Sequence, residues 1–154
     1  MPEQSLDTLY GPLLGPMENA SLGIPAIKPH EQDGEHIRPP KSRHDVTARG
    51  LPSLDETVTY IWVIDRSGHL IIAVEENLQG SPRHGTENAL GHPCLVNGQP
   101  ARMAGELKHD AGDWYIDGKS GRYGSPHRQP DASRLLANCA ALFRRLGLEV
   151  KYDM

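Results

Sequence analysis

The segment from Thr57 to Glu75 constrains the fold more than any other part of the chain. Its first half alternates apolar side chains on both faces of a single strand, with Val58, Tyr60, Trp62 and Ile64 on one face and Ile61 and Val63 on the other. A turn at Arg66-Ser67-Gly68 then leads into a second strand, His69–Val74. A strand that is apolar on both faces must be covered on both sides, so we predict that it lies at the centre of a sheet.

A second hairpin follows along the chain. Its strands, Ala101–His109 and Trp114–Lys119, flank a turn centred on Ala111-Gly112. This register places Leu107 opposite Ile116 and turns Glu106 to the other face of the sheet.

The segment Asp131–Leu146 has the spacing of an amphipathic helix. Its apolar residues recur at helical intervals and are Leu135, Leu136, Cys139, Leu142, Phe143 and Leu146. Asp131 is suited to the N-cap, and Gly147 to the position just after the last turn. We therefore expect a helix that supplies core rather than chemistry, followed by a short strand at Leu148–Tyr152.

Residues 1–56 differ from the rest of the chain. They contain eight of its thirteen prolines, and their apolar residues follow neither the helical nor the strand period. Because proline removes a backbone donor and turns its predecessor away from helix, we expect an extended, Pro-rich arm that adds little to the core. The fold predicted for residues 57–154 is α+β: a curved, mostly antiparallel sheet from two hairpins, packed by one C-terminal helix.

Charge and cysteine content limit the partners and the compartment. The formal charge of −4 and the isoelectric point of about 6.0 argue against nucleic acid. No apolar run reaches the roughly 18 residues of a membrane span, and the start of the chain lacks a signal-peptide core. Cys94 and Cys139 lie far apart, which indicates no disulfide framework. We expect a protein that is cytoplasmic in the producing cell, with delivery by a signal-peptide-free secretion system left open.

Two polar residues near the second hairpin are not needed to build it. His92 begins a short apolar segment, and Glu106 follows Gly105 inside a strand. A glycine weakens a strand, so Gly105 indicates that backbone or a ligand approaches closely there. His92 and Glu106 form the candidate catalytic pair, because a histidine can act as general base and a carboxylate in a cleft can accept a proton. Each has a structural alternative: His92 bonded to backbone, and Glu106 exposed to solvent and paired with Arg102.

The segment Ser120-Gly121-Arg122-Tyr123 supplies the candidate substrate-binding residues. Ser120 and Tyr123 offer hydroxyl groups, and Arg122 offers a guanidinium suited to phosphate or carboxylate. The glycine lets the backbone approach a ligand closely. The structural alternative is a strand end with a bulge.

The spacing of histidines and cysteines predicts no metal site, since none of them forms H-x-x-x-H or C-x-x-C. His84-Gly85-Thr86 is similar to the His-Gly-Ser/Thr that opens the NAD site of some ADP-ribosyltransferases. Tyr123 and Glu149 would complete a His, Tyr, Glu order. NAD is therefore the cofactor to test. Cys94, close to His92, is the alternative nucleophile.

The stretch from His92 to Tyr123 resembles a pattern H-S-S-F-x-A-G-x-P-V-x-A-A-G-E, followed by a hairpin and S-G-H-Y. The matching residues are His92, Leu95, Gly98, Pro100, Ala104, Gly105, Glu106, Ser120, Gly121 and Tyr123. The pattern occurs in bacterial polymorphic-toxin and effector-associated domains, and a similar segment lies near the C-terminal end of plant IQ-motif calmodulin-binding proteins. The chain departs from it at Pro93-Cys94, which replaces two serines, and at Arg122, which replaces the second histidine.

The resemblance covers Tyr60 to Val150 and implies a module with a site, without fixing a reaction. Calmodulin binding is not implied, because the chain has no I-Q-x-x-x-R-G segment.

Two functions are consistent with these observations. The first is a small bacterial effector or toxin-type domain that modifies a target by transfer from a nucleotide cofactor such as NAD, with ADP-ribosyl transfer as the first reaction to test. The second is a non-catalytic binding module, such as an immunity or adaptor protein, which the acidic balance fits. Either function implies a protein target, or a cognate immunity or effector protein, as the partner.

Overall fold

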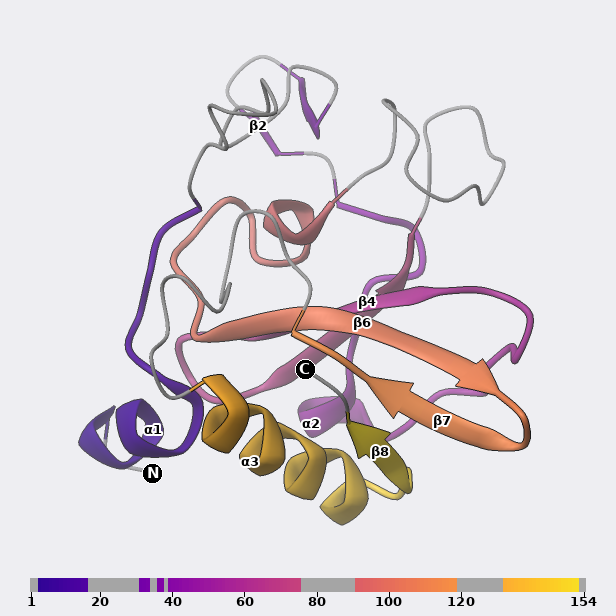
Figure 1. Cartoon of the computed structure of the whole chain (residues 1–154). Coiled ribbons are helices and arrows are strands. Elements are labelled where there is room, and N and C mark those ends of the chain that lie inside the picture. Colours follow the sequence, from indigo (N-terminus) through magenta and orange to yellow (C-terminus); the bar gives the residue numbers. More distant parts are fainter. Residues whose placement is uncertain are drawn as a thin grey trace, which may run out of the picture.

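A six-stranded sheet with the strand order β3-β5-β4-β6-β7-β8 forms the centre of the structure (Figure 1). The computed structural model describes residues 3–16, 31–33, 36–37, 39–75, 91–118 and 132–152. In sheet order, the strands are His44–Asp45, Leu70–Val74, Tyr60–Ile64, Met103–Asp110, Asp113–Ile116 and Val150–Tyr152. All neighbouring pairs are antiparallel except β7 and β8, which are parallel. The predicted α+β class is confirmed.

The α-helices pack against one face of this sheet. They are α1 (Glu3–Tyr10), α2 (Val46–Arg49) and α3 (Ala132–Arg145), and all three contribute to one buried apolar cluster. The opposite face is contacted by a short 3-10 helix, η3 (His92–Leu95), while β1 (Gln32–Asp33) and β2 (His36–Ile37) form a separate ribbon. No helix in the described ranges is long and apolar enough to cross a membrane.

The strand β4 lies at the predicted central position, between β5 and β6. All five of its residues are buried. Tyr60, Trp62 and Ile64 belong to the cluster under the helices, whereas Ile61 and Val63 belong to a second cluster on the opposite face. The alternation of apolar residues on both faces therefore identified a strand that is covered on both sides.

The second hairpin has the predicted register. Leu107 lies opposite Ile116, and the connection between the strands falls at Ala111-Gly112. Both turn residues have positive φ angles, of 50° and 89°. Such a pair of left-handed residues matches the twist of a two-residue hairpin, and it fixes which side chains face each side of the sheet.

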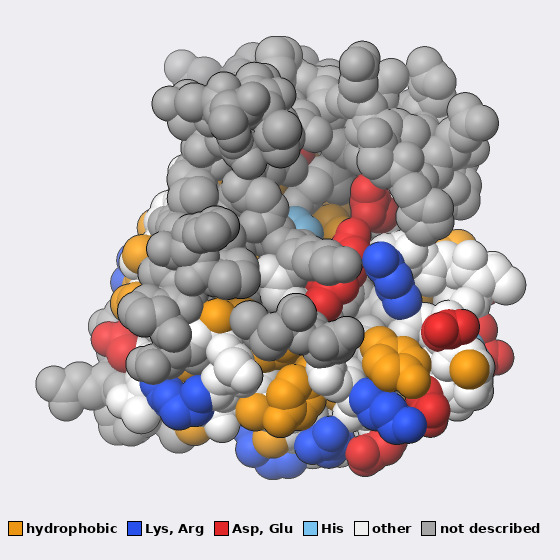
Figure 2. Space-filling view, viewed as in Figure 1, with side chains coloured by type: hydrophobic (Ala, Val, Ile, Leu, Met, Phe, Trp, Pro, Cys, Tyr) orange, Lys and Arg blue, Asp and Glu red, His pale blue; other side chains and the backbone are white. Residues whose placement is uncertain are grey.

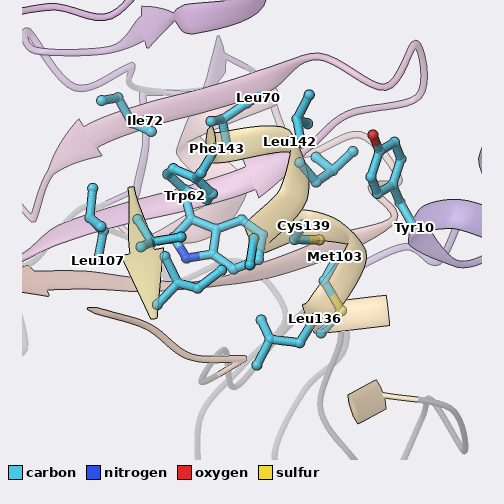
Figure 3. Packing of buried hydrophobic residues seen from close by; sticks show 14 of the residues in the cluster. Tyr10, Trp62, Leu70, Ile72, Met103, Leu107, Leu136, Cys139, Leu142 and Phe143 are labelled. Atoms are coloured by element: carbon cyan, nitrogen blue, oxygen red, sulfur yellow. The ribbon is translucent and has the colours of Figure 1, made fainter. Parts of the chain in front are cut away.

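The helix α3 supplies the apolar cover that we predicted for it (Figure 3). Leu135, Leu142 and Phe143 are 3%, 7% and 1% exposed. Phe143 meets Trp62 edge-to-face, with 5.7 Å between the ring centroids. Cys139 is fully buried in the same cluster, and burial raises the pKa of its thiol well above the ordinary value. This cysteine is therefore core and not a nucleophile.

A glycine cap ends α3. Gly147 has a φ of 106°, and its N–H donates to the carbonyl oxygen of Arg144 at 3.1 Å. The N–H of Leu148 donates to the carbonyl oxygen of Phe143 at 3.0 Å. This pair of bonds is the Schellman motif, so Gly147 has its predicted role. Asp131, the predicted N-cap, lies outside the described residues.

Replacing Leu142 with alanine is expected to lower the free energy of unfolding by about 2–5 kcal/mol, because the substitution leaves a cavity under the helix. Urea denaturation followed by circular dichroism measures the change. Ser133→Ala, at an exposed position of the same helix, is the control and should change stability by less than about 0.5 kcal/mol. An unchanged midpoint for Leu142→Ala would show that α3 is not part of the core.

Part of the segment that we expected to be an extended arm is helical and buried. Leu6 and Tyr10 of α1 and Val46 of α2 belong to the main apolar cluster. His44 and Asp45 form the edge strand β3, which pairs with β5. The expectation of an arm that adds little to the core is therefore wrong for these residues. A helix of two turns is too short to show a period, and it is stabilised by packing rather than by its own sequence.

Hydrogen bonds hold α1 against α3. The Arg134 side chain donates from Nη1 to the carbonyl oxygen of Thr8 at 2.7 Å, and the Asn138 side chain donates from Nδ2 to the carbonyl oxygen of Leu9 at 2.9 Å. These bonds satisfy carbonyl groups in the last turn of α1, which have no partner within the helix itself. The first and the last helix of the described chain are thus one packing unit.

An ion pair joins the edge strand β3 to the β4–β5 turn. His69 Nδ1 lies 2.8 Å from Asp45 Oδ2, and Asp45 Oδ1 accepts from the Ala48 N–H at 3.0 Å, which caps α2. The hydrogen bond to Asp45 raises the pKa of His69 above its ordinary value of 6.5. Burial alone would raise the pKa of Asp45, but the bonds from His69 and Ala48 outweigh it and lower that pKa below 3.8.

We expect this pair to make stability depend on pH. The protonated His69 stabilises the fold fully below its unfolded pKa, and the contribution is lost as the pH rises through the higher folded value. The loss should be less than about 1 kcal/mol, because His69 is more than a third exposed. Urea midpoints at about pH 6 and about pH 9 measure it against His69→Gln. An equal decline in His69→Gln would assign the pH dependence to other groups.

Candidate functional site

The helix η3 places His92 against the middle of β6. His92 is 8% exposed, and its Nε2 lies 2.7 Å from the carbonyl oxygen of Gly105. A carbonyl oxygen only accepts, so Nε2 carries the proton and donates it. Leu95, at the other end of η3, packs with Ile61 and Ala104 in the second apolar cluster. Of the two alternatives for His92, the geometry matches the residue bonded to backbone.

The predicted partner, Glu106, lies on the same face of the sheet as His92. It is directly opposite Ile61, and alternation along β6 places its side chain beside that of Ala104. The Glu106 carboxylate is 22% exposed and forms an ion pair with Lys108, with 2.9 Å between Oε1 and Nζ. The structure therefore brings both candidate catalytic residues to one face.

The pairing of Glu106 with Arg102 that we considered is wrong. The Arg102 side chain is fully buried and is bound elsewhere. Its Nε and Nη2 donate to the carbonyl oxygen of Arg66 at 3.1 and 3.0 Å, and its Nη1 donates to the carbonyl oxygen of Gly11 at 3.1 Å and to the carboxylate of Asp7. Arg102 joins α1 to the β4–β5 turn and has no place in the candidate site.

Gly105 is a glycine because the chain itself passes over it. A Cβ built at this position would lie 1.7 Å from the carbonyl oxygen of Asp117 and 3.0 Å from the Trp62 ring. The Asp117 side chain also accepts from the Glu106 N–H at 3.1 Å through Oδ1, and the Asp117 N–H donates to the Glu106 carbonyl oxygen at 3.1 Å. The close approach to Gly105 that we predicted is made by the backbone of Asp117 and not by a ligand.

A shallow groove opens beside Glu106, with a volume of about 570 Å³. Its charged lining residues are Glu56, Glu75, Glu106, Lys108 and His109. Thr57, Val58 and Thr59 complete it. His109 Nε2 lies 2.7 Å from Glu56 Oε2, and the His109 ring packs against Trp114. Three carboxylates thus share the groove with one lysine and one histidine.

Exposed ion pairs also occur away from the groove. Figure 2 shows acidic and basic side chains lying next to one another on the face viewed there. Lys151 pairs with Asp113 and Arg144 with Glu149, each at 3.0 Å. Such exposed pairs contribute little to stability. The groove differs from them because its acidic groups outnumber its basic ones.

A buried carboxylate lies behind η3, and sequence analysis did not find it. Glu31 is 0% exposed and accepts from the Gly91 N–H at 2.8 Å. The Cys94 thiol lies 3.8 Å from the Glu31 carboxylate, and it is itself 1% exposed. Only the burial of Glu31 distinguishes it from the other acidic residues of the N-terminal segment, and nothing in its sequence neighbours predicts that burial. The carboxylate holds the start of η3 in place.

Several predicted site residues lie outside the described parts of the chain. They are Ser120, Arg122, Tyr123 and the His84-Gly85-Thr86 segment. The predicted role of the first three in substrate binding therefore stays a prediction. Among the residues that the structure describes, no three His, Cys, Asp or Glu side chains lie close enough to hold a metal ion.

Comparison of the chain with known protein families, with curated proteins and with solved structures finds no match.

Proposed function

We propose that this protein is a non-catalytic binding module, whose groove beside Glu106 takes a positively charged segment of a partner protein. The observation that carries the proposal is the excess of carboxylates in the groove, where Glu56, Glu75 and Glu106 outnumber the single lysine. Such a concentration of one charge attracts and orients a partner of the opposite charge. The acidic composition fits this adaptor or immunity type of function.

The pKa of Lys108 supports the proposal because it reflects the negative charge of the groove. The hydrogen bond to Glu106 raises the pKa of Lys108 above its ordinary value, against the opposing effect of partial burial. The negative charges of Glu106, Asp117 and Glu75 raise it further. A site that stabilises its own ammonium group also stabilises the arginine or lysine of a partner, which can bind to the carboxylates beside Lys108 or displace it.

The contacts of His92 and Glu106 also have structural roles. The Nε2 of His92 donates to the Gly105 carbonyl oxygen and so holds the imidazole ring against β6. Glu106, in turn, is positioned through its own backbone by Asp117. Both residues therefore have structural contacts that account for their presence in this part of the chain.

Fluorescence anisotropy with a synthetic Arg-Gly repeat peptide tests the binding function. A Gln-Gly repeat of equal length is the uncharged control. We expect saturable binding of the arginine peptide alone, weakened by added salt. The double variant Glu75→Gln/Glu106→Gln should weaken it by about tenfold, whereas Glu149→Gln, which removes one carboxylate charge away from the groove, should not. Equal affinity for both peptides, or for both variants, would overturn the proposal.

The transferase remains a second candidate because His92 and Glu106 lie on one face, linked through Gly105. If it is correct, the protein releases nicotinamide from NAD, and Glu106→Gln lowers that rate by about 10²-fold or more. The melting temperature should hardly change, because the Glu106–Lys108 pair is partly exposed. Nicotinamide release that Glu106→Gln abolishes would replace the binding module with the transferase. The absence of release in the wild type would exclude this reaction.

A further inference from the structure

We propose that a second cavity, beside η3, binds a small organic anion with an apolar body and a terminal phosphate or carboxylate. The cavity lies between the β4–β5 turn, the residues that follow η3 and the segment that leads into β3. Its volume is about 520 Å³, within the range of sites for small molecules. The inference is independent of the proposed binding groove, since the two sites share no lining residue.

Two arginines provide the positive charge of this cavity. Arg43 is oriented by its Nε, which donates to the carbonyl oxygen of Leu95 at 2.7 Å. Its two terminal nitrogens form no hydrogen bond with the other described residues. Arg66 lies in the β4–β5 turn, where its carbonyl oxygen is held by Arg102. A guanidinium that is already fixed at Nε can bind an oxyanion with little further loss of side-chain freedom.

Asp65, the one carboxylate among the described lining residues, does not cancel this charge. Asp65 Oδ1 accepts from the backbone N–H groups of Ser67 and His69, each at 2.9 Å. Its charge is thus partly compensated by the turn that it stabilises. Among the described lining residues, the formal charges of the two arginines and Asp65 sum to +1.

The remaining walls suit an apolar body. Pro39, Val96 and Pro100 contribute apolar surface. The loop beyond η3 is held in shape by two consecutive left-handed residues, Asn97 and Gly98, with φ angles of 54° and 71°. A left-handed conformation is uncommon for a residue with a side chain, and such residues cluster at ligand sites. Apolar walls with a few oriented charges are the usual composition of a small-molecule site.

Phenyl phosphate and phenylacetate are the probes, with benzyl alcohol as the uncharged analogue. In a ¹⁵N–¹H NMR titration we expect at least one anion to shift the Asn97 and Gly98 amide signals saturably, and benzyl alcohol not to do so. Arg66→Gln should weaken anion binding by about tenfold, as expected for loss of a charged hydrogen bond. Arg49→Gln, an equal change of charge at an exposed position of α2, should not alter it.

The same titration distinguishes the two sources of anion. Stronger binding of phenyl phosphate assigns the site to phosphate esters, and stronger binding of phenylacetate assigns it to carboxylates. The proposal is overturned if neither anion gives a saturable shift, if benzyl alcohol binds as well, or if Arg66→Gln binds as the wild type does. None of these results bears on the arginine peptide, which is measured at the other site.

Discussion

Replacing Arg102 with methionine is expected to lower the free energy of unfolding by about 3–5 kcal/mol, one of the largest effects of any single substitution in this protein. Methionine retains the apolar stem but not the guanidinium. The carbonyl oxygens of Arg66 and Gly11 then lose donors inside the protein, where water does not replace them easily. The partner carboxylate of Asp7 is about half exposed and can be hydrated, so the loss comes mainly from the carbonyl groups.

Thermal and urea unfolding measure this loss. A change of that size in a domain of this length lowers the Tm by roughly 6–20 °C. Arg49→Met is the control, because Arg49 is exposed at the end of α2, and its substitution should leave the Tm within about 2 °C. A loss below about 1 kcal/mol for Arg102→Met would mean that α1 and the turn stay docked without the arginine.

Gly105→Ala should be nearly as damaging, with an expected loss of about 3 kcal/mol. The added methyl group would occupy the position of the Asp117 carbonyl oxygen and press on the Trp62 ring. The contacting atom belongs to backbone, so relief requires β6 and the residues after β7 to separate. That movement also displaces the Gly105 carbonyl oxygen, which accepts from His92.

Two measurements distinguish this local strain from a general loss of stability. Gly15→Ala is the control, because a Cβ there meets nothing within 4 Å, and its stability should be unchanged. The proton on His92 Nε2 should give a slowly exchanging NMR signal in the wild type, and this signal should broaden or shift in Gly105→Ala. An unchanged signal together with unchanged stability would show that the close approach of Asp117 is absent in solution.

The elements that sequence predicted well are those with a long or two-sided apolar pattern. The two apolar faces of β4 predicted its central position, and Ala111-Gly112 predicted the register of the second hairpin. Both signals come from residues that are neighbours in the sequence. The spacing of the apolar residues predicted the helix α3 equally well. In contrast, β8 has two exposed residues in three, and nothing in that pattern indicates a parallel pairing with β7.

The candidate site and the contacts around it were less predictable, because the contacts that hold these residues join distant parts of the sequence. Arg102 is bound to residues 91 and 95 positions away, and the buried Glu31 lies 60 positions before the N–H that it accepts from. In a single sequence, buried charged residues of this kind cannot be distinguished from exposed ones. The prediction of a close approach at Gly105 is confirmed, but the sequence did not indicate whether a ligand or the chain itself makes that approach.

The packing of α1 on α3 sets an order of events during synthesis. Leu9 of α1 and its partner Asn138 are separated by 129 positions. At usual translation rates α1 therefore leaves the ribosome roughly 6–26 s before its partner is made. A helix of this length is not stable alone, and Leu6 and Tyr10 lack the cover of α3 throughout that interval. The nascent chain thus presents an apolar segment to chaperones until α3 has been made, and the fold is completed only then.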